Sequence, residues 1–296
     1  MRFEVQQQHL SPLKSEPIED AADSDLSAFE GPVAGIDVGS RTTKVVILDK
    51  GCILSSEVLD TGVDAERTAE TALARAGQTA GVGMGSIKAI VGTGYGRVAL
   101  SFADKTATEL SCHARGCHFL DPTIRTVVDV GGQDCKVIHL DAGGNMMDFI
   151  MNDKCAAGTG RFLEMAARTL ELDLTDMAVM TADPARSCTI NSMCVVFAET
   201  EIISLLAKRR ASRDIVSGIY SAFAGRIGNM VKRLGVRPPM VFVGGVAKNR
   251  GLAQALAECL GLSFTPLGID PQLTGALGAA ALAMQSDEIK GCETCR

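Results

Sequence analysis

The segment Ile36–Asp49, IDVGSRTTKVVILD, decides how the chain folds, because a second segment repeats it. Val128–Asp141, VDVGGQDCKVIHLD, aligns with it without gaps over fourteen positions, of which seven are identical. Each segment predicts a short apolar strand, a glycine-containing turn and a second strand. Third strands are expected at Cys52–Leu59 and Met147–Met151. Two similar units about ninety residues apart indicate a duplicated domain rather than two hairpins that share turn residues by chance.

Between and after the two repeats, the pattern alternates helices and strands, which is typical of an α/β fold. The expected helices are Ala65–Arg75, Ala107–Phe119, Thr159–Leu172, Phe197–Lys208, Asp214–Leu234, Arg250–Cys259 and Leu273–Met284. Further strands are expected at Ile87–Gly92 and Met240–Gly244. Residues 1–30 are rich in acidic side chains and predict a flexible arm, and residues 285–296 predict a tail.

Length and composition limit the class of protein. The chain has 296 residues, a hydrophobic content of 46%, a net charge of −6 and a pI of about 5.3. These values suit a large apolar core in one or two domains, and no basic patch favours nucleic acid as a partner. The first thirty residues do not read as a signal peptide, and the longest apolar run, Thr274–Met284, is too short to cross a bilayer. We therefore expect a cytoplasmic protein with no membrane partner.

Two turns and one strand end carry the features of a phosphate and nucleotide site. Gly35–Lys44 places Asp37 at a strand end, before small residues whose N–H and hydroxyl groups can bind an anion. The Asp37 carboxylate can hold Mg²⁺, directly or through water. Asp129–Asp134, DVGGQD, repeats this arrangement, so two facing turns would hold a triphosphate from both sides. Val241–Asn249, VFVGGVAKN, ends a strand in two glycines that let a flat ring approach the backbone.

In this order, the three elements resemble the phosphate-1, phosphate-2 and adenosine motifs of the sugar kinase/Hsp70/actin ATPase superfamily. Each one alone is equally compatible with an ordinary tight turn. Gly275–Ala280, GALGAA, resembles the late helix of that superfamily beside the nucleotide. The resemblance implies an α/β fold of the duplicated ribonuclease H-like type, with the nucleotide in an interdomain cleft. The first half-domain would span 31–126 and the second 127–272, with the helix 273–284 returning to the first.

Two cysteines precede predicted helices. The chain has ten cysteines, most of which we interpret as core filling. Cys155 stands before the glycine turn of NDKCAAGTGRFLE, and Cys194 begins CVVFAETEI. A helix N-terminus favours the thiolate, which is the form that binds iron. A cubane cluster needs four thiolates, so two chains about a two-fold axis would share one [4Fe–4S] cluster, with the turn glycines offering N–H groups to its sulfurs.

Together with GIDVGS, DVGGQD, ELSCHA and GGVAKN, the two cysteine motifs closely resemble the ATP-dependent activator family. Its members are activators of 2-hydroxyacyl-CoA dehydratases and ATPase subunits of benzoyl-CoA reductases, and the likeness covers nearly the whole chain apart from its ends. The resemblance implies a homodimer, or a pseudo-symmetric heterodimer with a homologous subunit. Such a protein would use ATP and Mg²⁺ to drive single low-potential electrons, received from ferredoxin or flavodoxin, into an acyl-CoA-processing partner.

The resemblance also implies roles for single residues. Asp37, Asp129 and Gln133 would act in catalysis, the last two by orienting the attacking water. Cys155 and Cys194 would ligate iron. The nucleotide would contact Gly39, Ser40, Arg41, Thr42, Gly131, Gly132, Gly244, Gly245 and Asn249.

Two other classes of function fit the same fold. A carbohydrate or acid kinase would need a catalytic acid and a sugar pocket in the first half, and we find no compelling candidate for either. A filament or scaffold protein of the actin type would polymerise with nucleotide. Within the activator family, the N-terminal arm goes beyond a minimal activator and favours a benzoyl-CoA reductase subunit over a free dehydratase activator.

The remaining candidate groups are interpreted as structural. Lys208–Arg213 is expected to be a solvated helix end, with docking of an acidic partner as the alternative. Cys292 and Cys295 form an isolated CxxC on the tail. Packing or surface exposure, rather than metal binding, is expected for Cys112-His113, Cys117-His118 and Cys135. Cys188, six residues before Cys194, is expected to have no role at the cluster, with a supporting position beside the iron ligands as the alternative.

Overall fold

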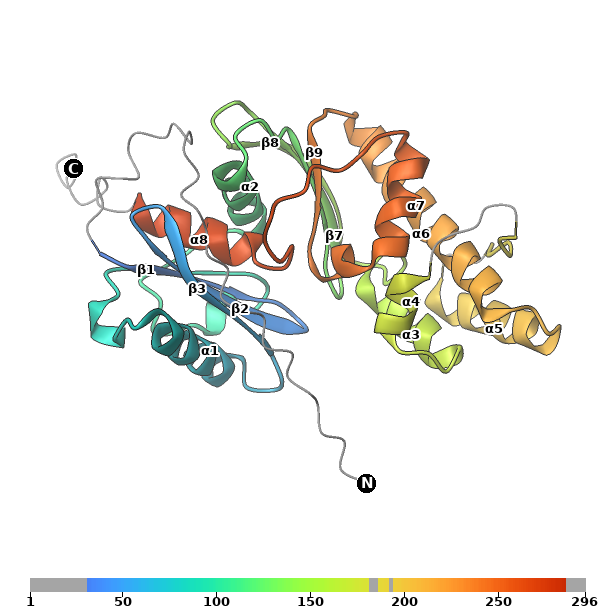
Figure 1. Cartoon of the computed structure of the whole chain (residues 1–296), viewed down its shortest axis with the longest axis horizontal. Coiled ribbons are helices and arrows are strands. Elements are labelled where there is room, and N and C mark those ends of the chain that lie inside the picture. The colour runs from blue at the N-terminus through green and yellow to red at the C-terminus, as the bar shows by residue number, and fades with distance from the viewer. Residues whose placement is uncertain (1–30, 181–185, 192–193, 286–296) are drawn as a thin grey trace, which may run out of the picture.

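The computed structural model describes residues 31–180, 186–191 and 194–285, which form two sheets with helices packed on them (Figure 1). The first sheet has the order β3-β2-β1-β4-β5 and comprises β1 (Val33–Val38), β2 (Thr42–Asp49), β3 (Cys52–Asp60), β4 (Ile90–Thr93) and β5 (Lys105–Thr106). The second has the order β8-β7-β6-β9 and comprises β6 (Thr126–Val130), β7 (Cys135–Leu140), β8 (Met146–Asn152) and β9 (Met240–Val243).

Both sheets are built on the same plan. β1 pairs antiparallel with β2 and places Asp37 opposite Lys44, while β6 pairs antiparallel with β7 and places Asp129 opposite Lys136. A parallel strand then flanks the central one in each sheet, β4 beside β1 and β9 beside β6. This repetition confirms the predicted duplicated α/β fold. The shared register puts the aspartate and lysine of each repeat at equivalent positions.

Helix ends follow local sequence signals. The Asp64 side chain accepts a hydrogen bond from the Arg67 amide and begins one helix, which ends at Gly81 with φ of 68°. The Asn249 side chain caps a second helix by the same kind of bond. The described helices are α1 (Ala65–Ala80), α2 (Glu109–Leu120), α3 (Gly160–Thr169), α4 (Leu174–Val179), α5 (Val195–Ala207), α6 (Ser212–Leu234), α7 (Arg250–Leu260) and α8 (Thr274–Met284). Seven of these correspond to the expected helices, and α4 is additional.

Two helices link the sheets. α8 packs on β1, β2 and β4 and against α2. α2 in turn contacts both sides, because Cys112 lies in the apolar cluster around α8, whereas Ala114 and Cys117 lie in the cluster around β6, β7 and β9. The boundaries 31–126 and 127–272 of the two half-domains stay a prediction. The position of α2 between the sheets is what brings its first turn to the cleft described below.

Three of the cysteines interpreted as packing or surface residues are buried, and Cys188 is half-buried. Cys112, Cys117 and Cys135 have at most 1% of their surface exposed. Burial raises the pKa of the Cys112 thiol to about 12 and that of Cys135 to about 11, so these sulfurs stay protonated. The N-terminal arm and the tail with Cys292 and Cys295 lie outside the described residues.

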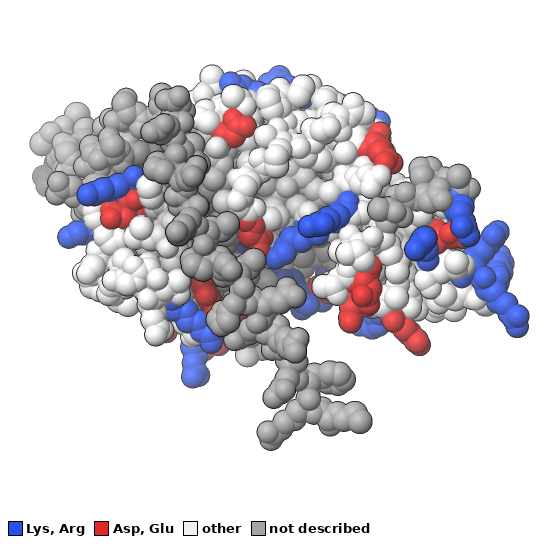
Figure 2. Space-filling model, viewed as in Figure 1, with Lys and Arg blue, Asp and Glu red and all other residues white. Residues whose placement is uncertain are grey.

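The surface carries both signs of charge, and basic side chains gather at the end of the molecule where α5 lies (Figure 2). Lys208, Arg209 and Arg210, directly after α5, are exposed, which agrees with the interpretation of this run as a solvated helix end. None of the described helices is both long enough and apolar enough to span a bilayer.

Candidate functional site

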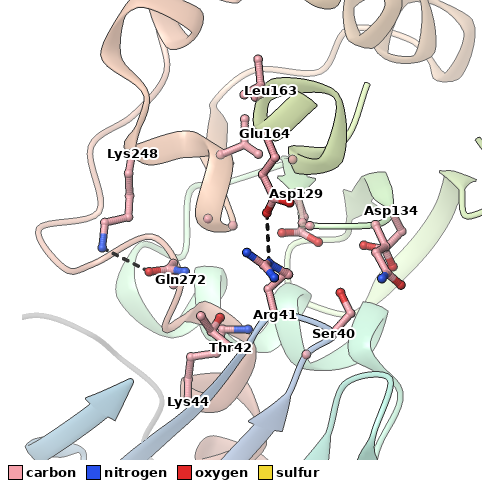
Figure 3. A pocket seen from close by; sticks show the side chains of 18 of the residues that line it. Ser40, Arg41, Thr42, Lys44, Asp129, Asp134, Leu163, Glu164, Lys248 and Gln272 are labelled. Atoms are coloured by element: carbon pink, nitrogen blue, oxygen red, sulfur yellow. Dashed lines mark hydrogen bonds and ion pairs between the residues drawn. The ribbon is translucent and has the colours of Figure 1, made fainter. Parts of the chain in front are cut away.

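A cavity of about 520 Å³ lies between the two sheets (Figure 3). Both glycine turns and the segment after β9 contribute to its walls. Every residue expected to act in catalysis or to contact the nucleotide lines it: Asp37, Gly39, Ser40, Arg41, Thr42, Asp129, Gly131, Gly132, Gln133, Gly244, Gly245 and Asn249. The fold thus brings these twelve residues together, and their individual roles stay predictions.

The first turn presents a carboxylate with one unused oxygen. Asp37 is the next-to-last residue of β1, with 2% of its surface exposed, and its Oδ2 lies 3.0 Å from the Lys44 ammonium. Its Oδ1 is buried and has no hydrogen-bond partner among the described residues. A buried carboxylate oxygen is normally bonded, so an unused one at the cavity fits a hard cation or its bound water. This donor therefore suits Mg²⁺.

The second turn holds a buried ion-pair network. Lys136, with 2% of its surface exposed, lies 3.2 Å from Asp129 Oδ2, 2.9 Å from Glu109 Oε1 and 2.8 Å from Asp134 Oδ2. Burial alone would lower the pKa of Lys136, but the three surrounding carboxylates raise it above its ordinary value. Burial has the opposite effect on an acid, and it raises the pKa of the Asp134 carboxyl. The lysine is therefore a permanent cation at the centre of three acids.

His113 connects this network to α8. Its Nε2 lies 3.6 Å from Asp129 Oδ2 and 3.8 Å from Glu109 Oε1, and its Nδ1 lies 2.9 Å from Thr274 Oγ1. Glu109, His113 and Asp129 place potential ligand atoms within 4.8 Å of one another, as in a metal site. The Lys136 ammonium already bonds both carboxylates of this trio. It supplies the cation there, so we do not interpret the trio as a metal site.

The segment after β9 closes the cavity on the side of the second sheet. Gly244 has φ of 86°, and a Cβ at this position would lie 2.4 Å from the Val130 carbonyl oxygen and 2.5 Å from Asp129 Oδ1. Only glycine fits there. Asn249 accepts from the Leu252 amide and donates to the Tyr220 hydroxyl at 2.9 Å. Its side chain therefore fixes the start of α7 at the cavity edge.

The loop that carries Cys155 differs from expectation. The sequence predicted that this thiol stands at a helix N-terminus, but α3 begins at Gly160, with Thr159 as its first flanking residue. Cys155 lies instead in the loop after β8, where the Asn152 amide donates to the Cys155 carbonyl at 2.8 Å and the Ala157 carbonyl at 3.2 Å. The prediction of a helix-capping Cys155 was therefore wrong.

The first amides of α3 bind the second phosphate turn rather than any group near the thiol. The Gly160 amide donates to the Gly131 carbonyl and the Arg161 amide to the Gly132 carbonyl, each at 2.9 Å. The Gly160 amide is consequently not available to cluster sulfurs, although the sequence had suggested that the turn glycines offer N–H groups to them. The same bonds attach the helix that follows Cys155 directly to the nucleotide cavity.

Cys194 lies where the sequence predicted, directly before α5. It is exposed, as are the side chains of Val196 and Phe197 that follow it, each with 67% of its surface accessible. Cys155 is half-buried and, like Cys194, belongs to no disulfide. Two free thiols that are not fully buried are half of the four thiolates that a cubane cluster needs.

The sequence reasoning missed several groups that line the cavity. Lys44 lines the cavity, and its counterpart Lys136 pairs with three carboxylates that do. The two lysines are identical in the two repeats, and this coincidence was the available signal for both. His113 was expected in helix packing or at a helix surface; it is buried, but it faces the cavity together with Glu109. The motif ELSCHA contains both and was the available signal, but it does not show that they reach the site, because they do so only through the packing of α2 against the second sheet.

Known proteins resemble the chain closely. Residues 34–283 match the model of the BadF/BadG/BcrA/BcrD ATPase family. The 2-hydroxyisocaproyl-CoA dehydratase activator of Clostridioides difficile is 45% identical over 257 residues, which cover 86% of this chain and 95% of the relative. A benzoyl-CoA reductase subunit of Thauera aromatica is 29% identical over 257 residues, covering 83% and 91%.

A solved structure extends the likeness to three dimensions. The activator of the 2-hydroxyisocaproyl-CoA dehydratase from Clostridium difficile, with bound ADPNP, superposes with a TM-score of 0.81 at 41% identity. The match covers 90% of this chain and 98% of that protein. The family inferred from the sequence motifs is thereby confirmed, and the chain belongs to the BadF/BadG/BcrA/BcrD ATPase family.

Proposed function

We propose that the chain is the ATP-hydrolysing activator of a 2-hydroxyacyl-CoA dehydratase and delivers single electrons through a [4Fe–4S] cluster shared by two subunits. The observation that carries the proposal is the attachment of α3 to the second phosphate turn by the Gly160 and Arg161 amides. Direct hydrogen bonds thus join a turn of the nucleotide cavity to the helix that follows the Cys155 loop. The 45% identity to a dehydratase activator, against 29% to a reductase subunit, reverses our preference for the reductase.

The chain's own residues would act on the nucleotide from both sheets. The unused Oδ1 of Asp37 would hold Mg²⁺ or its water on the side of the first turn. Gln133 and Asp129 would orient the attacking water from the second turn. The backbone amides of both turns would bind the phosphates. Hydrolysis would change the contacts that Gly131 and Gly132 make, and these turn residues hold the start of α3.

Cys155 and Cys194 would hold the cluster, which supplies one electron at a time to the partner enzyme when bound. A second copy, or a homologous subunit, would contribute the other two thiolates. It would also cover the exposed Val196 and Phe197, whose apolar surface is unfavourable in water. A movement of α3 would then alter the surroundings of the cluster. Because coupling is reciprocal, cluster and partner would also affect nucleotide affinity. A ferredoxin or flavodoxin would supply the electrons.

Iron analysis of anaerobically purified protein tests the cluster. We expect a brown dimer with about four irons per two chains. Cys155→Ala and Cys194→Ala should each lose iron and still bind ATP, because neither thiol lines the nucleotide cavity. Cys52→Ala is the matched control, since Cys52 is an exposed thiol on the first sheet and should leave the iron in place. A colourless monomer without acid-labile sulfide would refute the electron-transfer proposal.

Stoichiometry separates the remaining candidates. A dehydratase activator should act once for many turnovers of its partner, whereas a reductase subunit should consume ATP for every electron. We would measure ATP hydrolysed per electron with purified dehydratase and reductase components. A carbohydrate kinase would instead transfer phosphate to a sugar without any reductant. Phosphotransfer of that kind would contradict the activator assignment.

A further inference from the structure

An ion pair between Arg41 and Glu164 crosses the nucleotide cavity. Arg41 comes from the turn between β1 and β2, Glu164 comes from α3, and Arg41 Nε lies 3.0 Å from Glu164 Oε1. Figure 3 shows the arginine pointing across from the first turn toward the helix. Its stem passes over the second turn, since a Cβ on Gly132 would lie 2.6 Å from Arg41 Cγ. Arg41 therefore lies against the second phosphate turn and ends on the helix that follows the Cys155 loop.

The pair is open to competition. The exposed fractions of the two side chains are 54% for Arg41 and 24% for Glu164, and pairs this accessible contribute little to stability. Arg161 also approaches Glu164, at 3.4 Å from its Oε2. Glu164 thus keeps a cationic neighbour if Arg41 leaves. Arg41 has no second carboxylate within ion-pair distance among the described residues.

We propose that Arg41 exchanges partners, binding Glu164 when no γ-phosphate is present and the γ-phosphate when ATP is bound. A guanidinium binds carboxylate and phosphate through the same fork of N–H groups, and the phosphate carries the greater charge. ATP would thereby release α3 from the first turn, and hydrolysis would restore the link. The exchange needs only ATP binding, while its effect on the Cys155 loop rests on the proposed function.

A double-mutant cycle tests the exchange, with a non-hydrolysable ATP analogue and ADP titrated into the whole protein. Glu164→Gln removes the competitor, so affinity for the ATP analogue should rise about fivefold, and affinity for ADP should change less. In the Arg41→Gln background the same Glu164→Gln change should alter affinity by less than about twofold. If Arg41→Gln abolishes binding, Arg41→Lys, which keeps the charge but loses the fork, takes its place.

An equal gain with and without Arg41 would show that Glu164 acts only as a nearby negative charge and would overturn the exchange. No gain in either background would do the same. Glu57→Gln is the matched control, because Glu57 pairs with Arg75 at 3.5 Å, the exposed fractions are 25% and 55%, and neither residue lines the cavity. We expect no change in nucleotide affinity from this variant.

Hydrogen exchange provides a readout at the helix itself. The ATP analogue should alter amide exchange across α3 in the unchanged protein, and Arg41→Gln should remove that nucleotide-dependent difference. Persistence of the full difference in Arg41→Gln would contradict the exchange. Iron content separates the two proposals, because Glu164→Gln should keep its iron. A failed partner exchange in an iron-containing dimer would leave the electron-transfer proposal intact.

Discussion

Asp37 and Asp129 occupy the same position in the two repeats, yet their surroundings differ. Each is the next-to-last residue of a central strand and faces a lysine of the neighbouring strand, at 3.0 Å for Lys44 and 3.2 Å for Lys136. Among the described residues, Lys44 has no other carboxylate within ion-pair distance, whereas Lys136 has two more. One aspartate keeps an unused buried oxygen, and the other lies in a network of opposite charges.

The difference comes from a helix that breaks the symmetry. α2 places Glu109 and His113 against the second aspartate, and no equivalent pair from the described residues reaches the first. The two sheets therefore place the two aspartates in the same backbone geometry, while α2 gives them different charged neighbours. We infer that the first aspartate remains available for a cation and the second is already balanced by its neighbours.

The largest expected effect is the decrease in the free energy of unfolding when Lys136 is replaced. Lys136→Met would leave three carboxylates without their shared cation, which should lower the free energy of unfolding by about 3–5 kcal/mol. Lys44→Met would leave only Asp37, beside the cavity, without its cationic partner, and should lower the free energy of unfolding by about 1–3 kcal/mol. Urea denaturation of both variants at neutral pH measures the difference. Equal losses would mean that the additional carboxylates do not make the second site more dependent on its lysine.

Two equivalent glycines, one beside each aspartate, offer a second test of the difference between Asp37 and Asp129. Gly94 after β4 and Gly244 after β9 both have φ of 86°, and a Cβ on them would lie 2.4 Å from Asp37 Oδ1 and 2.5 Å from Asp129 Oδ1, respectively. An alanine at either position should lower the free energy of unfolding by at least about 1–3 kcal/mol, because backbone strain adds to overlap of the Cβ with the Val38 or the Val130 carbonyl oxygen. Only Gly94→Ala pushes on the unused oxygen of Asp37, so it alone should weaken the Mg²⁺ dependence of ATP binding.

Isothermal titration of ATP at several Mg²⁺ concentrations measures that dependence in both glycine variants. Gly244→Ala is the internal control, because it strains the equivalent turn without touching Asp37. A reduced Mg²⁺ dependence in both variants would show that Asp37 does not differ from Asp129 in its effect on the cation. An unchanged dependence in Gly94→Ala would argue that Asp37 Oδ1 does not hold the cation.

Much of the fold could be predicted because its signals are local. The repeat of Ile36–Asp49 in Val128–Asp141 carries both hairpins, and the asparagine before Arg250 caps α7 where the pattern placed the helix start. α4, with six residues, is too short to show a helical period. β5, with two residues, exists only through its pairing with β4. Such elements depend on tertiary contacts.

The residues of the site likewise divide into those marked by local sequence signals and those placed by tertiary packing. Backbone turns with their glycines were predicted to line the nucleotide cavity, and they do. Glu109 and His113 could not be placed, because a helical pattern does not reveal which strand the helix packs against. The start of α3 was predicted within one residue, at Thr159 against Gly160, but the expectation that Cys155 stands at this helix N-terminus was wrong for a related reason. The amide of the turn glycine Gly160, which was expected to be available to cluster sulfurs, binds the Gly131 carbonyl about thirty residues earlier in the chain.

The smallest expected effect is on the pH dependence of stability, and it should differ between Glu109 beside Lys136 and Glu57 in the first half. Burial alone would raise the pKa of the Glu109 carboxyl, but His113 and Lys136 hold it below its ordinary 4.5. A lowered folded-state pKa adds stability above the ordinary value, and this stability is lost as pH falls. Glu109→Gln should therefore cost about 1 kcal/mol at pH 7, and the difference should shrink steadily once the pH falls below 4.5. Urea midpoints across this range measure it, with Glu57→Gln in the first half as control, and a difference that grows in acid would contradict the charge network around Lys136.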